Sequence, residues 1–112
     1  GHQTRDFVYV DDVVDVLIKS IKKLSENKNN YIFNLGTGVS TRIDKILYKL
    51  IEISKKNPKI EKFDLDKSDP VKSIGVYNEL NKFFNLNLET FKDLDYGLES
   101  TYSYIKKYYE KI

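Results

Sequence analysis

The fold of this chain is decided by the stretch Asp6-Phe-Val-Tyr-Val-Asp-Asp-Val-Val-Asp-Val-Leu-Ile-Lys-Ser-Ile-Lys-Lys-Leu24. Residues 6–10 are rich in β-branched and aromatic side chains, which predicts a short strand or an extended segment. Asp11 or Asp12 is expected to cap a helix, because apolar residues then recur at steps of three and four. Aspartates begin this helix and lysines end it, as the helix dipole favours. The chain therefore opens with a strand-to-helix unit.

Strand and helix signals continue to alternate along the rest of the chain. Further strands are predicted at 31–35, which ends in the turn Gly36-Thr-Gly38, and within 59–65. Capping signals and apolar spacing predict three more helices, at residues 41–56, 78–84 and from the capping box 90–93 to Ile112. We therefore predict a single α/β domain over residues 1–112, with a small sheet of about three short strands and four helices.

Composition excludes several classes of function. The 112 residues carry 19 Lys and Arg against 17 Asp and Glu, so the net charge of +2 lacks the basic field of most nucleic-acid-binding proteins. Cysteine is absent, which excludes disulfides and thiolate metal sites and fits a cytoplasmic protein. The apolar runs are too short to span a bilayer. No nucleic acid, membrane or metal is therefore expected as a partner.

Four segments resemble, in order and spacing, the carboxyl-terminal third of NAD-dependent sugar-nucleotide epimerases and dehydratases, which are extended short-chain dehydrogenase/reductase enzymes. The longest is Gly1-His-Gln-Thr-Arg-Asp-Phe-Val-Tyr-Val-Asp-Asp-Val-Val14, and the second is Tyr31-Ile-Phe-Asn-Leu-Gly-Thr-Gly38. Asp69-Pro-Val-Lys-Ser73 and Leu94-Asp-Tyr-Gly-Leu98 resemble the later elements. The third segment departs from the family pattern, because no arginine precedes Asp69.

The resemblance implies the carboxyl-terminal part of an extended Rossmann-type enzyme that binds a nucleotide-sugar substrate. The family's glycine-rich loop and its catalytic Tyr-x-x-x-Lys pair have no counterpart at matching positions here. We therefore expect no catalytic residue and no cofactor on this chain, with NAD held by a missing amino-terminal Rossmann domain. Without that domain apolar surface would be bare, so dimerisation (a homodimer), strand exchange or local rearrangement is expected. The alternatives are a non-catalytic binding or interaction domain on the same scaffold and, with the Tyr/Lys-rich tail as sole support, a nucleic-acid binder.

Arg5 is the first candidate for the substrate site, because the resemblance places it where the family holds the diphosphate. A guanidinium suits that task, since its planar fork gives paired hydrogen bonds to phosphate oxygens. The plain alternative is a surface arginine paired with Asp6 or Asp11. Gln3 is expected to support the same loop.

Three other patterns have simpler interpretations. Gly36 and Gly38 are better explained by a tight turn with a positive φ than by a phosphate loop. The spacing Tyr102-x-x-x-Lys106 is interpreted as a coincidence in a tail rich in both residues. His2, the one histidine, has no cysteine or second histidine with which to build a metal site.

Overall fold

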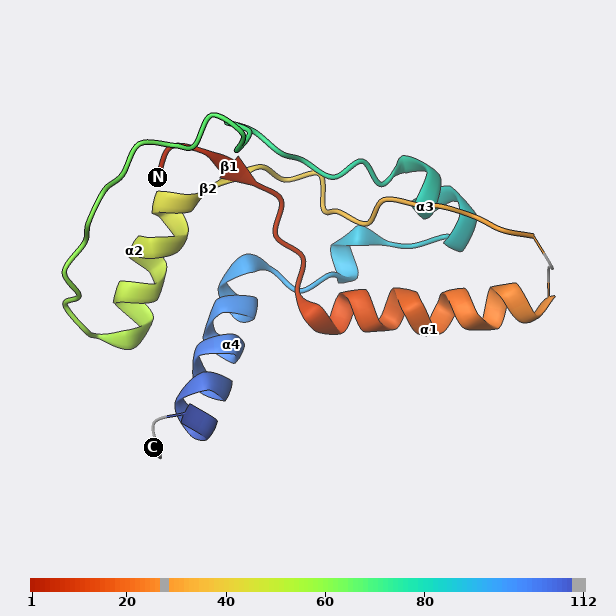
Figure 1. The fold of residues 1–112 in the computed structure, drawn as a ribbon. Coiled ribbons are helices and arrows are strands. Elements are labelled where there is room, and N and C mark those ends of the chain that lie inside the picture. Colours follow the sequence, from red (N-terminus) through yellow and green to blue (C-terminus); the bar gives the residue numbers. More distant parts are fainter. Residues whose placement is uncertain (27–28, 110–112) are drawn as a thin grey trace.

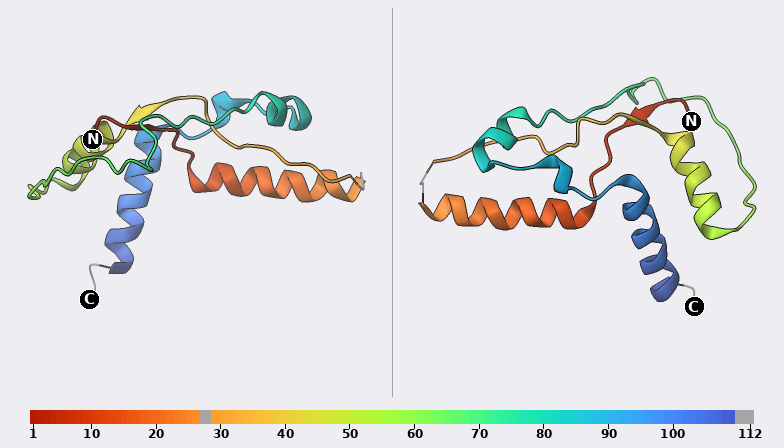
Figure 2. Two further views of the ribbon diagram at one scale, coloured as in Figure 1. Left: turned by 45° about the horizontal axis from the view of Figure 1, so that its top comes forward. Right: turned by 180° about the vertical axis from the view of Figure 1, so that it is seen from behind.

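The computed structural model describes residues 1–26 and 29–109. In chain order its elements are β1 (Thr4–Arg5), α1 (Val10–Glu26), β2 (Thr41–Arg42), α2 (Ile43–Ser54), α3 (Asn78–Phe84), the 3-10 helix η1 (Leu88–Thr90) and α4 (Leu94–Tyr109). Helices α1 and α3 lie at one end of the molecule, and α2 packs beside α4 at the other (Figures 1 and 2). The radius of gyration is 17.1 Å. A compact chain of this length would have one of about 13 Å, so the arrangement is open.

Helix α1 confirms the first predicted helix but not its cap. The helix already begins at Val10, so Asp11 and Asp12 lie within its first turn. The buried Asp12 carboxylate accepts a hydrogen bond from the backbone N–H of Lys92, at 2.9 Å. Asp12 therefore ties α1 to the segment before α4 instead of capping its own helix.

The other helices also form close to the predicted ranges, and again the caps differ. Arg42 occupies the N-cap position of α2 without a side-chain capping bond, and it pairs with the carboxylate of Asp44. Helix α4 is capped by Asp93, whose Oδ1 accepts the N–H of Tyr96 at 2.7 Å. Both predicted capping boxes are therefore wrong, because Thr41 belongs to β2 and Thr90 to η1. The predicted last helix ended at Ile112, which lies outside the described residues.

The predicted three-stranded sheet is wrong. The structure has a two-stranded antiparallel sheet that pairs Thr4 with Arg42 and Arg5 with Thr41. Thr4 also forms an isolated parallel bridge with Lys72. Segments 6–9, 31–35 and 59–65 are not strands. A strand needs a neighbouring backbone to hydrogen-bond with, and local composition cannot supply one.

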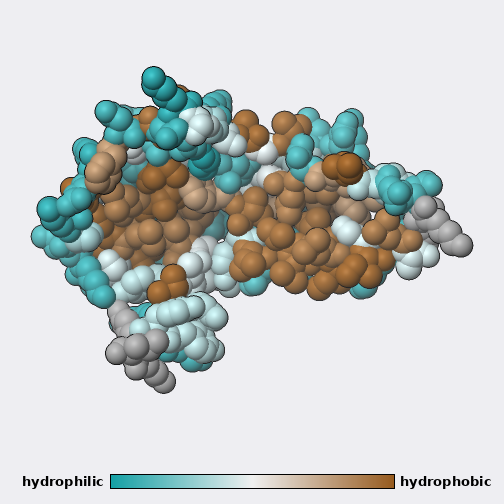
Figure 3. Space-filling model, viewed as in Figure 1, coloured by the Kyte–Doolittle hydropathy of each residue, from teal (hydrophilic) through white to brown (hydrophobic). Residues whose placement is uncertain are grey.

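The core is small and much apolar surface is exposed. Within the described part of the chain three apolar residues are buried, Val16, Leu80 and Leu86, and Phe33 and Phe84 pack against them. The accessible surface is 9203 Å². A folded monomer of 13.2 kDa would expose about 6,400 Å². Apolar side chains form a broad band across one face, from α2 and α4 to α1 (Figure 3).

Helix α1 contributes most clearly to this exposed band. Its residues Val10, Val14, Leu17, Ile21 and Leu24 are spaced alternately by four and three, and each is at least 45% exposed. Such spacing forms a continuous apolar stripe along one side of a helix. The stripe has no covering layer among the residues that the structure describes. Nor is any helix there long and apolar enough to cross a membrane.

Candidate functional site

Arg5 projects from β1, and its side chain is 24% exposed. Its Nη1 donates hydrogen bonds to the carbonyl oxygens of Thr4 (2.7 Å) and Pro70 (2.9 Å). Its Nη2 donates to Oδ1 of Asp69 in an ion pair. The partner is therefore neither Asp6 nor Asp11, the two considered from the sequence. A guanidinium has five N–H groups, so two of them make no hydrogen bond within residues 1–26 and 29–109.

A shallow hollow of about 370 Å³ adjoins the guanidinium. Its lining combines small and polar residues with three aliphatic ones: Arg5, Asp6, Asn34, Leu35, Ser73, Ile74, Gly75 and Val76. Arg5 is the basic residue in that lining. Asp6 adds a carboxylate to the same lining, and its oxygens accept hydrogen bonds from Thr37, Gly38 and Gly75. An anion could therefore bind in the hollow only beside Arg5, through the unused N–H groups of the guanidinium.

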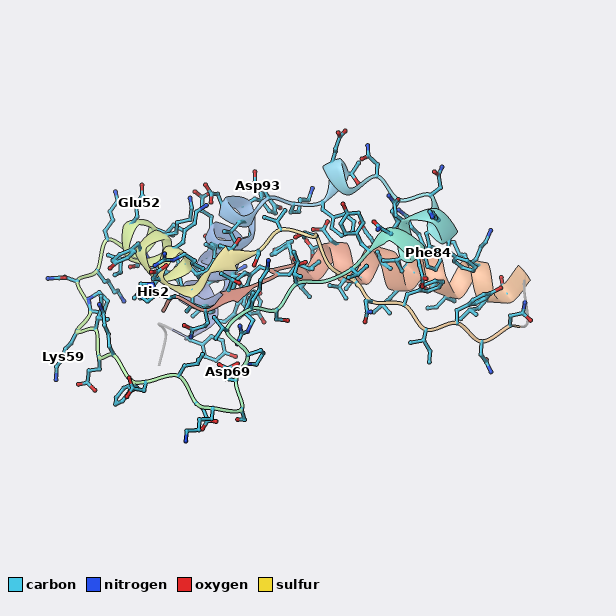
Figure 4. The ribbon with its side chains drawn as sticks, turned by 90° about the horizontal axis from the view of Figure 1, so that it is seen from above. His2, Glu52, Lys59, Asp69, Phe84 and Asp93 are labelled. Carbon is cyan, nitrogen blue, oxygen red and sulfur yellow. The ribbon has the colours of Figure 1, made fainter. Side chains whose placement is uncertain are left out.

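Gln3 does not share this hollow. It lines a second one, of about 600 Å³, between the start of α2 and the loop 60–66. The backbone oxygen of Gln3 accepts the N–H of Ile43 at 3.0 Å, which fixes the chain at that point. Asp69 lines the second hollow and at the same time pairs with Arg5. In Figure 4 Asp69 lies where the long loop after α2 returns toward the sheet. Asp69 thus stands between the two hollows.

The carboxylate of Asp6 joins three segments that are distant in the chain. It accepts the N–H of Thr37 at 3.0 Å and the Thr37 hydroxyl at 2.5 Å. It also accepts the N–H of Gly38 at 2.9 Å and that of Gly75 at 3.0 Å. We call Asp6 and these three residues the Asp6 cluster. Partial burial raises the pKa of this carboxyl, but the hydrogen bonds outweigh it and leave the pKa below its ordinary value.

Two glycines allow the Asp6 cluster to close. A Cβ on Gly75 would lie 2.6 Å from the Cα of Gly36, so only glycine fits at this backbone crossing. Gly38 has φ +74°, which confirms the tight turn predicted for residues 36–38. The amides of Thr37 and Gly38 point to the protein's own carboxylate, and so they are not free to bind a phosphate.

The Tyr102 and Lys106 pair faces a different groove. Both residues line a depression of about 600 Å³ between α2 and α4, far along the chain from Arg5. Lys49 and Asp95 close part of this groove with an ion pair of 2.6 Å. The groove is lined by both acidic and basic side chains. No feature of it gives Tyr102 and Lys106 a role beyond that of exposed residues on a surface helix.

His2 and the paired aspartates of α1 are dispersed. His2 contacts Arg42 and lies 3.7 Å from the carboxylate of Asp44. Asp11 is exposed, whereas Asp12 is buried against Lys92. No group of three or more His, Asp or Glu that could hold a metal ion is found in the described ranges.

Two residues of the site were missed by sequence reasoning. From the sequence, Asp6 was considered as part of an extended segment and as a partner of Arg5, but not as the residue that organises the turn 36–38. Asp69 was noted for its resemblance to a family element and not as the partner of Arg5. Neither role has a local signal, because the partners lie 31 to 69 residues away along the chain.

The amino-terminal part of the chain is similar to a known protein family. Residues 1–36 match the model of the NAD dependent epimerase/dehydratase family. The match covers about a third of the chain and includes Gln3, Arg5, Asp6 and Gly36. No curated protein matches the sequence. Over its first 36 residues the chain is therefore similar to this family.

Proposed function

We propose that the chain is the substrate-binding part of an NAD-dependent nucleotide-sugar epimerase or dehydratase, with Arg5 binding the diphosphate of the substrate. The observation that carries the proposal is the place of Arg5. It lies within the residues that match the family, and it lines a hollow with two N–H groups left to donate. Its fixed positive charge and planar fork suit a diphosphate.

The way Arg5 is held supports this role. Its Nη1 is fixed to two backbone oxygens, so the side chain keeps its direction without the help of a ligand. The neighbouring Asp6 cluster fixes the backbone on both sides of the hollow. A preorganised donor loses little freedom when it binds an anion, which favours affinity.

The redox chemistry belongs, in this proposal, to a cofactor domain that this chain does not supply. NAD would exchange a hydride with the sugar there, and this chain would only hold the nucleotide half of the substrate. The accessible surface exceeds that of a compact monomer by roughly 2,800 Å², whereas a standard interface buries about 800 Å² per partner. The apolar stripe of α1 is the part best suited to such a partner domain.

Calorimetric titration with UDP, dTDP and their sugars tests the proposal. We expect weak binding that falls at least about tenfold in Arg5→Ala, because a charge-assisted pair of hydrogen bonds is lost. Arg42→Ala is the matched control, since Arg42 is the other arginine of the chain and pairs with Asp44 on the surface. Failure of all nucleotides to bind a chain whose circular dichroism shows it folded would refute the proposal and favour a non-catalytic interaction domain.

A further inference from the structure

Helix α1 carries a surface that can match itself. The helix lies at the edge of the molecule with its apolar stripe uncovered (Figures 1 and 3). Ile18, which is 47% exposed, widens the stripe at its middle. The exposed apolar positions are therefore arranged almost symmetrically about the midpoint between Leu17 and Ile18. When a second α1 runs in the opposite direction about that midpoint, apolar residues of the two helices meet: Val10 meets Leu24, Val14 meets Ile21, and Leu17 meets Ile18.

Three charged side chains border the stripe on the side of Ile18. Asp15 and Lys22 follow Asp11 by four and eleven residues, which is about one and three helical turns, so all three lie along the same side of α1. All are exposed, and none of their side chains forms an ion pair within residues 1–26 and 29–109. Asp11 and Asp15 carry the same charge one turn apart, so they repel each other. In the antiparallel arrangement, Lys22 of the second copy lies level with residue 13, between these two aspartates.

We propose that the apolar stripe of α1 binds a second copy of this chain, with the two α1 helices antiparallel about a two-fold axis between Leu17 and Ile18. Two-fold symmetry repeats each contact, so the lysine of each copy meets the two aspartates of the other. A parallel pair would instead bring Asp11 level with Asp11 and Lys22 level with Lys22, and these like charges repel. The charges of α1 therefore favour the antiparallel arrangement.

The size of the uncovered surface also suits a second copy. Helix α1 has 17 residues and is about 25 Å long. The chain exposes roughly 2,800 Å² more than a compact monomer, which is more than the 800 Å² or so that each partner buries in a standard interface. The proposed cofactor domain would compete with a second copy for this stripe. The inference therefore concerns the chain without that domain, and it does not depend on Arg5.

Reversal of charge at Lys22 tests the polar contacts. Sedimentation equilibrium at low salt should show an association constant roughly tenfold lower for Lys22→Glu, because attraction to two aspartates becomes repulsion at both ends of the interface. Lys19→Glu is the matched control. It makes the same change of charge in the same helix, but on the side opposite the stripe, and should change the constant by at most about twofold.

A mixture of two variants tests whether Lys22 meets Asp11 and Asp15. The double variant Asp11→Lys/Asp15→Lys should also associate weakly with itself. Mixed in equal amounts with Lys22→Glu, it should associate about as tightly as the wild type, because every contact across the interface then joins opposite charges. Circular dichroism of each variant checks that the helices are retained.

Single cysteines test the direction of the helices, since the chain has no cysteine of its own. In the antiparallel pair, the two copies of residue 17 lie about 1.5 Å apart along the helix axis, and those of residue 24 about 20 Å apart. A disulfide requires Cα atoms within about 7 Å. Mild oxidation should therefore cross-link Leu17→Cys into a dimer and leave Leu24→Cys largely uncross-linked.

Several results would overturn the inference. They are a wild type that stays monomeric at all concentrations, equal effects of Lys22→Glu and Lys19→Glu, a mixture no tighter than its components, and cross-linking of Leu24→Cys as fast as that of Leu17→Cys. Dimerisation with the expected behaviour in a chain that binds no nucleotide would support this inference and refute the proposed function. Nucleotide binding through Arg5 by a chain that stays monomeric would do the reverse.

Discussion

Replacement of Asp6 by alanine should destabilise the chain more than any other single polar substitution in the described residues. The variant removes the acceptor for three backbone N–H groups, on Thr37, Gly38 and Gly75, and for the Thr37 hydroxyl. Each N–H left without a partner costs about 1–3 kcal/mol, and partial access of water reduces the total, so we expect a loss of about 3–5 kcal/mol. A chain of 112 residues with so small a core has a free energy of unfolding near the lower end of the usual range, roughly 6 kcal/mol.

Urea unfolding followed by circular dichroism at pH 7 measures the loss. Asp6→Asn should lose about half as much, because its side-chain oxygen still accepts while its amide group faces other donors. Asp11→Ala is the control, since Asp11 is exposed in the first turn of α1 and should cost at most about 0.5 kcal/mol. If Asp6→Ala and Asp11→Ala unfold at the same urea concentration, the reasoning about the Asp6 cluster is wrong.

The lowered pKa of Asp6 should make the free energy of unfolding depend on pH. Hydrogen bonds lower the pKa of folded Asp6 despite the opposing effect of burial, whereas the unfolded pKa stays near its ordinary value of about 3.9. The stabilisation is therefore fully present above about pH 4 to 5, and it is lost as the pH falls through the lower, folded value. Asp6→Asn should lack this component of the acid transition. A variant with the same pH profile as the wild type would contradict the assignment.

Three further predictions follow from single features. Gly75→Ala should destabilise the chain by about 2 kcal/mol or more in the same urea assay, because its Cβ would meet the Cα of Gly36 at 2.6 Å; an unchanged midpoint would show that this crossing can open freely. The chain on its own should self-associate through the apolar stripe of α1, and Ile21→Lys, at a position 70% exposed, should shift it toward monomer in sedimentation velocity without loss of helix; a wild type that is monomeric at all concentrations would count against this. Tyr102→Phe should leave the nucleotide affinity unchanged within about twofold in calorimetry, because Tyr102 lines a groove that does not include Arg5. A tenfold loss of affinity would show that Tyr102 contributes to nucleotide binding.

The helices were predictable because their signals are local. The apolar stripe from Val10 to Leu24 repeats with the helical period, and a helix makes its backbone hydrogen bonds within itself. The caps were not predictable to the same degree. Thr90 and Asp93 both suit an N-cap, and the choice of Asp93 depends on where η1 ends. Boundaries of this kind are set by tertiary packing as much as by the residue type.

The sheet and the site could not be predicted from local patterns. Segment 31–35 has the composition of a strand, but no neighbouring backbone pairs with it in the described part of the chain. Thr4 pairs with Arg42 and Arg5 with Thr41, although each strand has only two residues and no periodic signal. The candidate site was found only in part, since Arg5 came from the resemblance whereas its partner Asp69 depends on how the loop after α2 returns.

The Asp6 cluster also determines the order in which the chain can fold. Its hydrogen bonds close loops of 31 and 69 residues, and the longer closure costs about 0.7 kcal/mol more chain entropy than the shorter one. Helices α1 and α4 need no such closure and can form within microseconds. We therefore expect the contacts of this carboxylate to form later than the helices, because each of them requires a long loop to close. One acidic side chain near the amino terminus thus joins segments of this open chain that meet only after most of it has been traversed.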